Sequence, residues 1–332
     1  MKAMILAAGF GTRLFPLTID RTKPAIPFLN KPLVGYVAEY VAQFGFKDVV
    51  VNLHHQPESV MEALGDGKKY GVKIHYTLET PEILGTSGAL DNARHLLENE
   101  TFLIVNGKII TDIDINAALE THRKTGAIAT MVLKENKKLE KFSIVETEDG
   151  FVTGFGGFPE PLISKQIANR KSQIENPLMF TGIHILEPEV FNYIPRGVYS
   201  DIVPTFYNPA IKKGEKIAAH VTGGKWFELS TIPRYLEITL AMLKEGSVCK
   251  GENCRISSKA VVENSILWDD VTIAENARLN RVILADGVKI DSGEMYENAA
   301  IVRAEMLGSV EIPEKSLPGY VKGSNFVVPF GQ

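Results

Sequence analysis

Short apolar runs alternate with amphipathic segments over the first third of the chain. Strands and helices in alternation are typical of βαβ units in a mostly parallel sheet. The runs lack polar alternation, as expected of strands that are covered on both faces. Ligands in such sheets bind in the loops at the carboxyl ends of the strands. We predict strands at Met4–Ala8, Val49–Leu53, Val72–Leu78 and Phe102–Val105, and helices at Leu33–Phe44, Pro57–Leu64 and Ser87–Leu97.

The pattern changes twice further along. From about Ala127 short β segments alternate with glycine-rich or polar turns, and a predicted helix at Ile232–Leu243 closes this region. After Gly246 a six-residue repeat begins, which is typical of a hexapeptide β-helix with an aliphatic residue inside each short strand. Its end coil needs a cap or a partner. The repeat has Val261, Leu267, Ile273 and Leu279 at every sixth position, and Ser265, Val271, Ala277 and Ile283 at the fifth place of each hexad.

These patterns predict an α/β fold in two domains. Residues 1–246 would form a Rossmann-like domain with a mostly parallel sheet, and residues 247–332 a short left-handed parallel β-helix with a C-terminal tail. The length of 332 residues agrees with this division, since one domain takes about 150 residues.

Composition narrows the class of protein. Hydrophobic residues make up 45% and charged residues 23%, as in soluble globular chains. Lys and Arg number 36 against 40 for Asp and Glu, and no basic run offers a footprint for nucleic acid. Cys249 and Cys254 stand without a second pair, which favours free thiols over a zinc site or a disulfide framework. We see neither a signal peptide nor a membrane segment, and we expect a cytoplasmic protein.

A candidate phosphate-binding loop follows the first predicted strand, where residues 6–18 read LAAGFGTRLFPLT. Gly9 and Gly11 allow close backbone approach, and successive amides in such a loop cradle phosphate oxygens. Thr12-Arg13 does not supply the Gly-Lys-Ser/Thr of a Walker A loop, and Leu14 stands where a dinucleotide fingerprint needs a small residue. Arg13 offers a bidentate fork and Lys23 a point charge for phosphate.

Residues 6–18 with Lys23-Pro24 closely resemble the leading signature of the sugar-nucleotide pyrophosphorylases, which couple a nucleoside triphosphate to a sugar 1-phosphate. The similarity continues in order to the hexapeptide repeats, and it is strongest to the branch with mannose 1-phosphate guanylyltransferases. Further matching segments are Asn30-Lys31-Pro32, EILGTSGAL at 82–90, FLIVNG at 102–107 and FTGIHILEP at 180–188.

The resemblance implies formation of a nucleotide sugar and pyrophosphate from GTP or another nucleoside triphosphate and a sugar 1-phosphate. Arg13 would bind the leaving pyrophosphate, and Lys23 would neutralise the α-phosphate during in-line attack. Gly85 would contact the base through its backbone. Mg²⁺ is the expected cofactor. The implied nucleotide-binding set is Leu6, Ala8, Gly9, Gly11, Thr12 and Gly85.

The metal motif departs from the family pattern. The family Asp that binds Mg²⁺ is Lys108 here, and an ammonium does not ligate a cation. Glu228 stands where the second metal carboxylate is usually an Asp. Asp112 and Asp114 are possible substitute ligands, although capping of the helix that starts at Ile115 is the favoured role.

The sugar side also departs from the pattern. The family Tyr-Gly pair is Phe142-Ser143, and its Glu-Lys-Pro is Gly157-Phe158-Pro159. The losses cluster on one substrate half, since the triphosphate loop, Lys23 and the base loop are unchanged. The positions that match the sugar-phosphate side are Asn106, Lys108, Ser143, Gly157, Thr181 and Gly182.

Two functions remain open. In the first, Lys108 replaces part of the charge of Mg²⁺, metal arrives with the nucleotide at Glu228, and the enzyme is active. In the second, the protein is a regulatory or scaffold subunit that binds nucleotide or nucleotide sugar without turnover. We favour the first because the triphosphate half is intact. We expect a homo-oligomer or pairing with a catalytic homologue.

Other candidate residues favour structural roles. His54-His55 has no third ligand and reads as a polar strand end. Trp226 and Trp268 read as packing residues, and Tyr199–Asp201 with Pro204 as a turn before a helix. An acyltransferase-like β-helix protein is disfavoured, because it needs more coils and a catalytic histidine, and no histidine follows His220.

Overall fold

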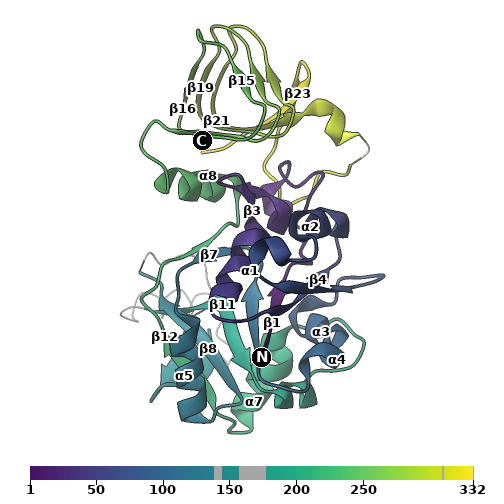
Figure 1. Ribbon diagram of the computed structural model, residues 1–332, viewed down its shortest axis with the longest axis vertical. Helices are drawn as coiled ribbons and strands as arrows, with labels where there is room; N and C mark the ends of the chain where they lie inside the picture. The colour runs from purple at the N-terminus through teal and green to yellow at the C-terminus, as the bar shows by residue number, and fades with distance from the viewer. Residues whose placement is uncertain (138–143, 157–176, 309, 332) are drawn as a thin grey trace. The chain divides into compact units, whose positions relative to one another are not determined.

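A computed structural model describes residues 1–137, 144–156, 177–308 and 310–331 (Figure 1). The chain forms two compact units that interleave in sequence. The first consists of residues 1–8, 37–54 and 64–226, and the second of residues 9–36, 55–63 and 227–332. Two segments of the N-terminal region thus belong to the same unit as the hexapeptide repeats.

A nine-stranded sheet organises the first unit, in the order β5-β4-β1-β6-β11-β8-β12-β10-β9. Consecutive apolar residues in β1 and β4 are buried, as their lack of polar alternation predicts. The strands are β1 (Lys2–Leu6), β4 (Asp48–Leu53), β5 (Lys73–Leu78), β6 (Phe102–Asn106), β8 (Ala129–Glu135), β9 (Ile144–Glu148), β10 (Phe151–Phe155), β11 (Leu178–Leu186) and β12 (Ile217–Val221).

The α/β class is confirmed, but the sheet is mixed rather than mostly parallel. Strands β5, β4, β1 and β6 run parallel, as the alternating pattern predicts. Strand β11 pairs antiparallel with both β6 and β8, and β10 pairs antiparallel with β12 and β9. Within the described residues, β9 and β10 follow each other with only a short turn between them, and such neighbours pair antiparallel.

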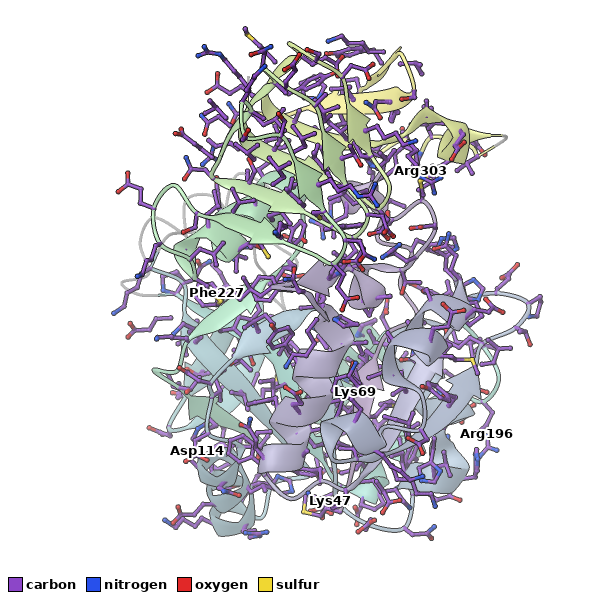
Figure 2. All side chains as sticks on the ribbon, turned by 45° about the horizontal axis from the view of Figure 1, so that its top comes forward. Lys47, Lys69, Asp114, Arg196, Phe227 and Arg303 are labelled. Atoms are coloured by element: carbon purple, nitrogen blue, oxygen red, sulfur yellow. The ribbon has the colours of Figure 1, made fainter. Side chains whose placement is uncertain are left out.

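Helix α5 (Ile115–Thr125) packs on β8 and β12 of the sheet, and several helix ends follow local sequence signals. Figure 2 labels Asp114, the residue before α5. Its carboxylate accepts hydrogen bonds from the backbone N–H groups of Asn116 and Ala117 at 2.9 and 3.4 Å. This confirms the predicted capping role of Asp114. The segment predicted as one helix at 87–97 forms two helices that meet at Ala93. The helices are α1 (Leu33–Gln43), α2 (Pro57–Leu64), α3 (Gly85–Asn92), α4 (Arg94–Leu97), α5 (Ile115–Thr125), α7 (Asn208–Lys212) and α8 (Ile232–Ala241).

The second unit contains stacked parallel β coils (Figure 1). Val248 pairs with Ser265 and Ile266 with Ile283, so each coil advances by 17 residues. The strands of the coils are β14 (Val248–Lys250), β15 (Arg255–Ile256), β16 (Val261–Glu263), β17 (Ser265–Leu267), β18 (Thr272–Ile273), β19 (Arg278–Leu284), β20 (Lys289–Ile290) and β21 (Met295–Arg303). Outside the coils and the nine-stranded sheet, four further short strands are β2 (Pro27–Phe28), β3 (Lys31–Pro32), β7 (Ile109–Thr111) and β13 (Trp226–Glu228).

The length of one coil explains why the predicted hexad positions are mostly, but not all, buried. Seven of the eight predicted inward positions are buried, and Val261 is the exception at 47% exposed. Leu279 pairs with Val262 rather than Val261, because a coil of 17 residues is one shorter than three hexads. A prediction with a fixed period of six residues is therefore displaced by one residue in each coil.

Corners of the coils repeat the same 17-residue spacing in their backbone conformations. Side chains of Asn and Asp tolerate the left-handed region better than most others, so these positions suit sharp turns. Two columns of residues with positive φ are Asn253, Asp270 and Gly287, and Asn264, Arg281 and Asn298.

A hairpin of the tail covers the last coil. Strand β23 (Asn325–Pro329) pairs antiparallel with β21, and β22 (Tyr320–Lys322) pairs with β23. Antiparallel pairing satisfies the backbone groups that the final strand would otherwise leave open. The cap predicted for the end coil is thus supplied by the chain itself. Within the described residues, no helix is both long enough and apolar enough to span a membrane.

Candidate functional site

The glycine loop turns sharply at Gly11, just after the first strand. Gly11 has φ +67°, and a Cβ there would lie 3.1 Å from the Thr18 methyl and 3.2 Å from the Lys23 Cβ. The Leu14 N–H donates to the Gly11 carbonyl at 2.9 Å, which closes a short helical turn over Thr12–Leu14. A side chain at position 11 would therefore be strained and crowded.

Gly9 differs from Gly11 because the protein leaves space beside it. A Cβ at Gly9 would meet no atom within 4 Å, and Gly9 and Phe10 are both exposed. No contact among the described residues accounts for a glycine at this position. Open backbone next to a turn allows a ligand oxygen to approach the amides, as a phosphate loop requires.

Lys23 lies on the same side as this loop and is only 9% exposed. It begins a short helical turn, Lys23–Ala25, and the preceding Thr22 donates its N–H to the Ser59 hydroxyl at 3.1 Å. These contacts fix the backbone from which the lysine extends. Lysine is seldom this buried, and its place beside a glycine loop is suited to an anionic ligand.

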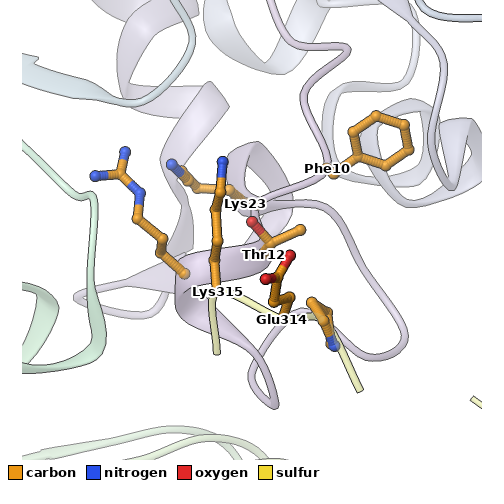
Figure 3. Close-up of a pocket in the computed structure, with 8 residues that line it drawn as sticks. Phe10, Thr12, Lys23, Glu314 and Lys315 are labelled. Atoms are coloured by element: carbon orange, nitrogen blue, oxygen red, sulfur yellow. The ribbon is translucent and has the colours of Figure 1, made fainter. Parts of the chain in front are cut away.

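One open pocket of about 440 Å³ brings the predicted triphosphate residues together (Figure 3). Phe10, Gly11, Thr12, Arg13 and Lys23 line it. Three further lining residues come from the tail: Pro313, Glu314 and Lys315. A lysine in a polar tail carries no local motif, so the sequence offered no signal for these three.

A second group of predicted residues lies at the carboxyl edge of the sheet in the other unit. The Ala7 N–H donates to the Asn52 Oδ1 at 2.9 Å, and the Asn52 Nδ2 donates to the Glu79 Oε1 at 2.6 Å. The Glu79 Oε2 accepts the Leu84 N–H at 2.7 Å, and Glu79 is only 1% exposed. This chain of hydrogen bonds joins the end of β1 to the residue before Gly85. The sequence reading missed Glu79, although a carboxylate directly after a predicted strand was a signal.

Leu6 and Ala8, two predicted nucleotide-binding residues, lie at the end of β1 and just after it. The Leu6 carbonyl accepts the Gly107 N–H at 2.9 Å, so the start of the turn after β6 is tied to β1. Ala8 is buried. Both positions are consistent with a loop held firmly at its start.

The base loop begins α3 and is held by residues 199–202. The Ser87 and Gly88 N–H groups donate to the Ser200 carbonyl at 3.0 and 3.1 Å, and Thr86 donates through its N–H and hydroxyl to the Asp201 carboxylate. The first N–H groups of this helix are thus satisfied inside the protein. The predicted structural role of the turn at 199–201 is confirmed.

Asn106 and Gly182 meet where β6 and β11 pair. A Cβ at Gly182 would lie 2.1 Å from the Asn106 Nδ2, so only glycine fits. The register of β11 shifts between Phe180 and His184, a bulge of the kind that re-aims backbone near sites. Thr181 is buried, and its hydroxyl donates to the Val132 carbonyl at 2.7 Å.

Two family models match the chain in sequence order. A family model described as nucleotidyl transferase matches residues 2–245, and a GlmU-like C-terminal hexapeptide model matches residues 238–297. The chain belongs to the nucleotidyl transferase family. The resemblance drawn from residues 6–18 is therefore confirmed, and so is the hexapeptide domain.

Curated relatives of this nucleotidyl transferase include several sugar-phosphate enzymes. An N-acetylmuramate α-1-phosphate uridylyltransferase of Neisseria meningitidis is 34% identical over 71% of this chain and 96% of its own length. A UTP–glucose-1-phosphate uridylyltransferase of Synechocystis is 28% identical over 91% of this chain and 80% of its own length. A mannose-1-phosphate guanylyltransferase of Arabidopsis thaliana is 30% identical over 91% of this chain and 81% of its own length.

A solved structure supports the fold. It is a Bacillus anthracis protein described as a glucose-1-phosphate thymidylyltransferase, and it matches with a TM-score of 0.60 at 21% identity. The match covers 73% of this chain and 94% of the Bacillus anthracis chain.

The predicted metal-site residues of this nucleotidyl transferase lie in different surroundings. Among the residues that the structure describes, no three His, Cys, Asp or Glu side chains group as metal ligands. Asp112 is exposed, and its Oδ1 accepts the Lys225 N–H at 2.6 Å. Glu228 is buried in the second unit, and Lys108 is half-buried in the turn between β6 and β7. Members of the family generally use Mg²⁺. These residues do not fit an ion held by the protein alone.

Several sugar-side positions fall outside the described residues, namely Phe142, Ser143, Gly157, Phe158 and Pro159. Their predicted departures from the family pattern remain predictions.

Histidine, cysteine and tryptophan residues have the structural surroundings that the sequence favoured. The His54 Nδ1 lies 2.9 Å from the Glu79 carbonyl oxygen, at the end of β4. Cys249 and Cys254 are free thiols, and burial raises the pKa of each. Trp226 and Trp268 are buried, and their indole N–H groups donate to the Thr181 carbonyl and to the Tyr235 hydroxyl.

Proposed function

We propose that this nucleotidyl transferase forms a nucleotide sugar and pyrophosphate from a nucleoside triphosphate and a sugar 1-phosphate. The convergence of the glycine loop, Arg13 and the buried Lys23 on one pocket carries the proposal. A pocket lined by a glycine loop and two cationic side chains is suited to a polyphosphate. The relatives are named as uridylyltransferases and guanylyltransferases of sugar 1-phosphates, which supports the same reaction class.

In the proposed reaction, a phosphate oxygen of the sugar 1-phosphate attacks the α-phosphorus of the triphosphate. The bond from that phosphorus to the bridging oxygen of the β-phosphate breaks, and pyrophosphate leaves with the electron pair. Lys23 neutralises the α-phosphate, and Arg13 binds the leaving pyrophosphate. Positioning and charge stabilisation supply most of the catalysis in such transfers. The proposed base contact is the backbone at Gly85, whose loop is oriented by Glu79.

Lys108 favours a second candidate function, a subunit that binds nucleotide without turnover. A lysine stands where the family has a metal carboxylate, and loss of about 4 kcal/mol of transition-state stabilisation slows a reaction about 1000-fold. We favour the active enzyme, in which the Lys108 ammonium supplies positive charge at the sugar-phosphate side. A cytoplasmic location, and assembly as a homo-oligomer or with a catalytic homologue, accompany the proposal as predictions.

Pyrophosphate release tests the proposal. The protein is incubated with Mg²⁺, each nucleoside triphosphate and a panel of sugar 1-phosphates, and pyrophosphate is measured by a coupled assay. We expect release with at least one pair. Absence of release with every pair, together with nucleotide binding by calorimetry, would overturn the enzyme and support the binding subunit.

Lys108→Asp separates a recruited lysine from an eroded site. If the ammonium supplies needed charge, the variant should lose about tenfold or more in kcat with the best substrate pair, as removal of a charge-stabilising group does. Lys124→Ala, which removes an exposed lysine paired with Glu120 on α5, is the matched control. A gain of activity in Lys108→Asp would contradict the role given to Lys108.

A further inference from the structure

The tail contributes a fixed turn to the triphosphate pocket. The Ser316 N–H and hydroxyl donate to the Pro313 carbonyl at 2.9 and 2.6 Å, which places Glu314 and Lys315 at the two central positions of a tight turn. Both belong to the same compact unit as the glycine loop. The backbone conformation at Lys315 is therefore set by local hydrogen bonds.

Strands on both sides anchor the connection that carries this turn. Upstream, a short helical segment, Ala304–Leu307, follows β21 directly. Downstream, β22 pairs with β23, and β23 pairs with β21. Because both ends are tied to the last coil, the turn is presented by the β-helix and not by a free terminus.

The charge of the pocket lining favours an anion with several charged oxygens. Arg13, Lys23 and Lys315 are cations and Glu314 is the one carboxylate among the eight residues that line it. Figure 3 shows the Lys315 side chain extended into the pocket, with its ammonium toward the same side as that of Lys23. Like charges gathered at one pocket repel each other, and a bound polyphosphate relieves that repulsion.

We propose that Lys315 is a third polyphosphate-binding cation of this site, supplied by the hexapeptide domain. The proposal rests on the function proposed above and extends it to the tail. The exposed ammonium binds the terminal phosphates of the nucleotide and then the pyrophosphate product as a point charge. Glu314 opposes the same anion and thereby limits its affinity.

Calorimetry with inorganic tripolyphosphate tests Lys315 without a choice of base or sugar. Lys315→Ala should weaken binding about tenfold, as loss of one charge-assisted contact does. Glu314→Gln should strengthen binding, because it removes the opposing charge. Lys289→Ala, an exposed lysine on β20 of the same coils, should leave binding unchanged.

The binding results distinguish a failure of the role of Lys315 from a failure of the proposed nucleotidyl transfer. If wild-type protein binds tripolyphosphate and Arg13→Ala weakens it while Lys315→Ala does not, the role of Lys315 is wrong and the triphosphate site stands. Tighter binding by Lys315→Ala would show a tail that blocks the pocket, and would also overturn the role of Lys315. If wild-type protein neither binds tripolyphosphate nor releases pyrophosphate with any substrate pair, the proposed function itself fails.

Discussion

Two glycines of one loop illustrate how single residues divide between folding and ligand binding. Gly11 is needed by the protein, since its φ of +67° and its contacts with Thr18 and Lys23 leave little room for a side chain. Gly9 borders open space, and the protein alone does not require it. The sequence motif treats the two glycines alike, and the structure distinguishes them.

Substitution of Gly11 should therefore mainly lower stability, whereas substitution of Gly9 should mainly weaken ligand binding. Gly11→Ala should lower the free energy of unfolding by about 1–3 kcal/mol, because alanine is strained at positive φ. Gly9→Ala should change stability by less than about 0.5 kcal/mol, as at an open surface position, and still weaken tripolyphosphate binding. Urea unfolding and calorimetry measure the two effects. Unchanged binding by a stable Gly9→Ala protein would contradict the phosphate-loop assignment.

Among the elements, β11 joins the parallel and antiparallel parts of the sheet and carries a buried histidine. His184 is 3% exposed, and its Nδ1 shares a hydrogen bond of 2.6 Å with the Tyr207 hydroxyl. Burial lowers the pKa of His184 from 6.5 to about 3, because the charged imidazolium loses its hydration. The central strand of the sheet thus favours a neutral imidazole.

Acid should destabilise the fold through His184. Between pH 6.5 and about 3 the unfolded chain binds a proton that the native chain does not, so stability falls as pH falls. At about 1.4 kcal/mol per pH unit, His184 accounts for a loss of about 2 kcal/mol between pH 6.5 and 5. Below about pH 3 both states are protonated and this contribution levels off.

Urea unfolding of His184→Gln at the two pH values checks this prediction. The variant should show a smaller difference in unfolding free energy than wild type between pH 6.5 and 5. His95→Gln, at an exposed position on α4, should keep the wild-type difference. An equal acid loss in His184→Gln and wild type would contradict the assignment.

At the scale of the whole molecule, the β-helix and residues 9–36 belong to one compact unit. The Tyr235 hydroxyl donates to the Pro27 carbonyl at 2.5 Å and accepts the Trp268 indole N–H at 3.1 Å. The Arg21 guanidinium lies 5.0 Å from the Trp268 ring and forms an ion pair of 2.5 Å with Asp286. The hexapeptide coils thereby hold the backbone on either side of Lys23.

Loss of one hydroxyl should show this coupling. Tyr235→Phe leaves the Trp268 N–H and the Pro27 carbonyl without this partner, which should lower the unfolding free energy by about 1–3 kcal/mol and weaken tripolyphosphate binding. Tyr40→Phe is the matched control, because its hydroxyl donates to the Ile113 carbonyl at 2.7 Å in the other unit. It should lower stability and leave binding unchanged. Equal binding by both variants would argue against the coupling.

The sequence by itself determined the features that depend on neighbouring residues. The alternating apolar runs gave the parallel strands, the hexads gave the β-helix, and the loop at residues 9–13 with Lys23 gave the phosphate chemistry. Each is written within a few tens of residues, because the period of an element and the turn of a glycine loop are set locally. The family resemblance followed from the same short motifs.

Only the tertiary structure decided which distant segments meet. It made the sheet mixed, set the coil at 17 residues, oriented Glu79 toward the base loop and brought Lys315 to a pocket formed some 300 residues earlier in the chain. Such contacts depend on how whole strands pair and coils stack, and no local pattern in the sequence records that pairing. The triphosphate chemistry was therefore readable from the sequence, whereas the share of the tail in it was not.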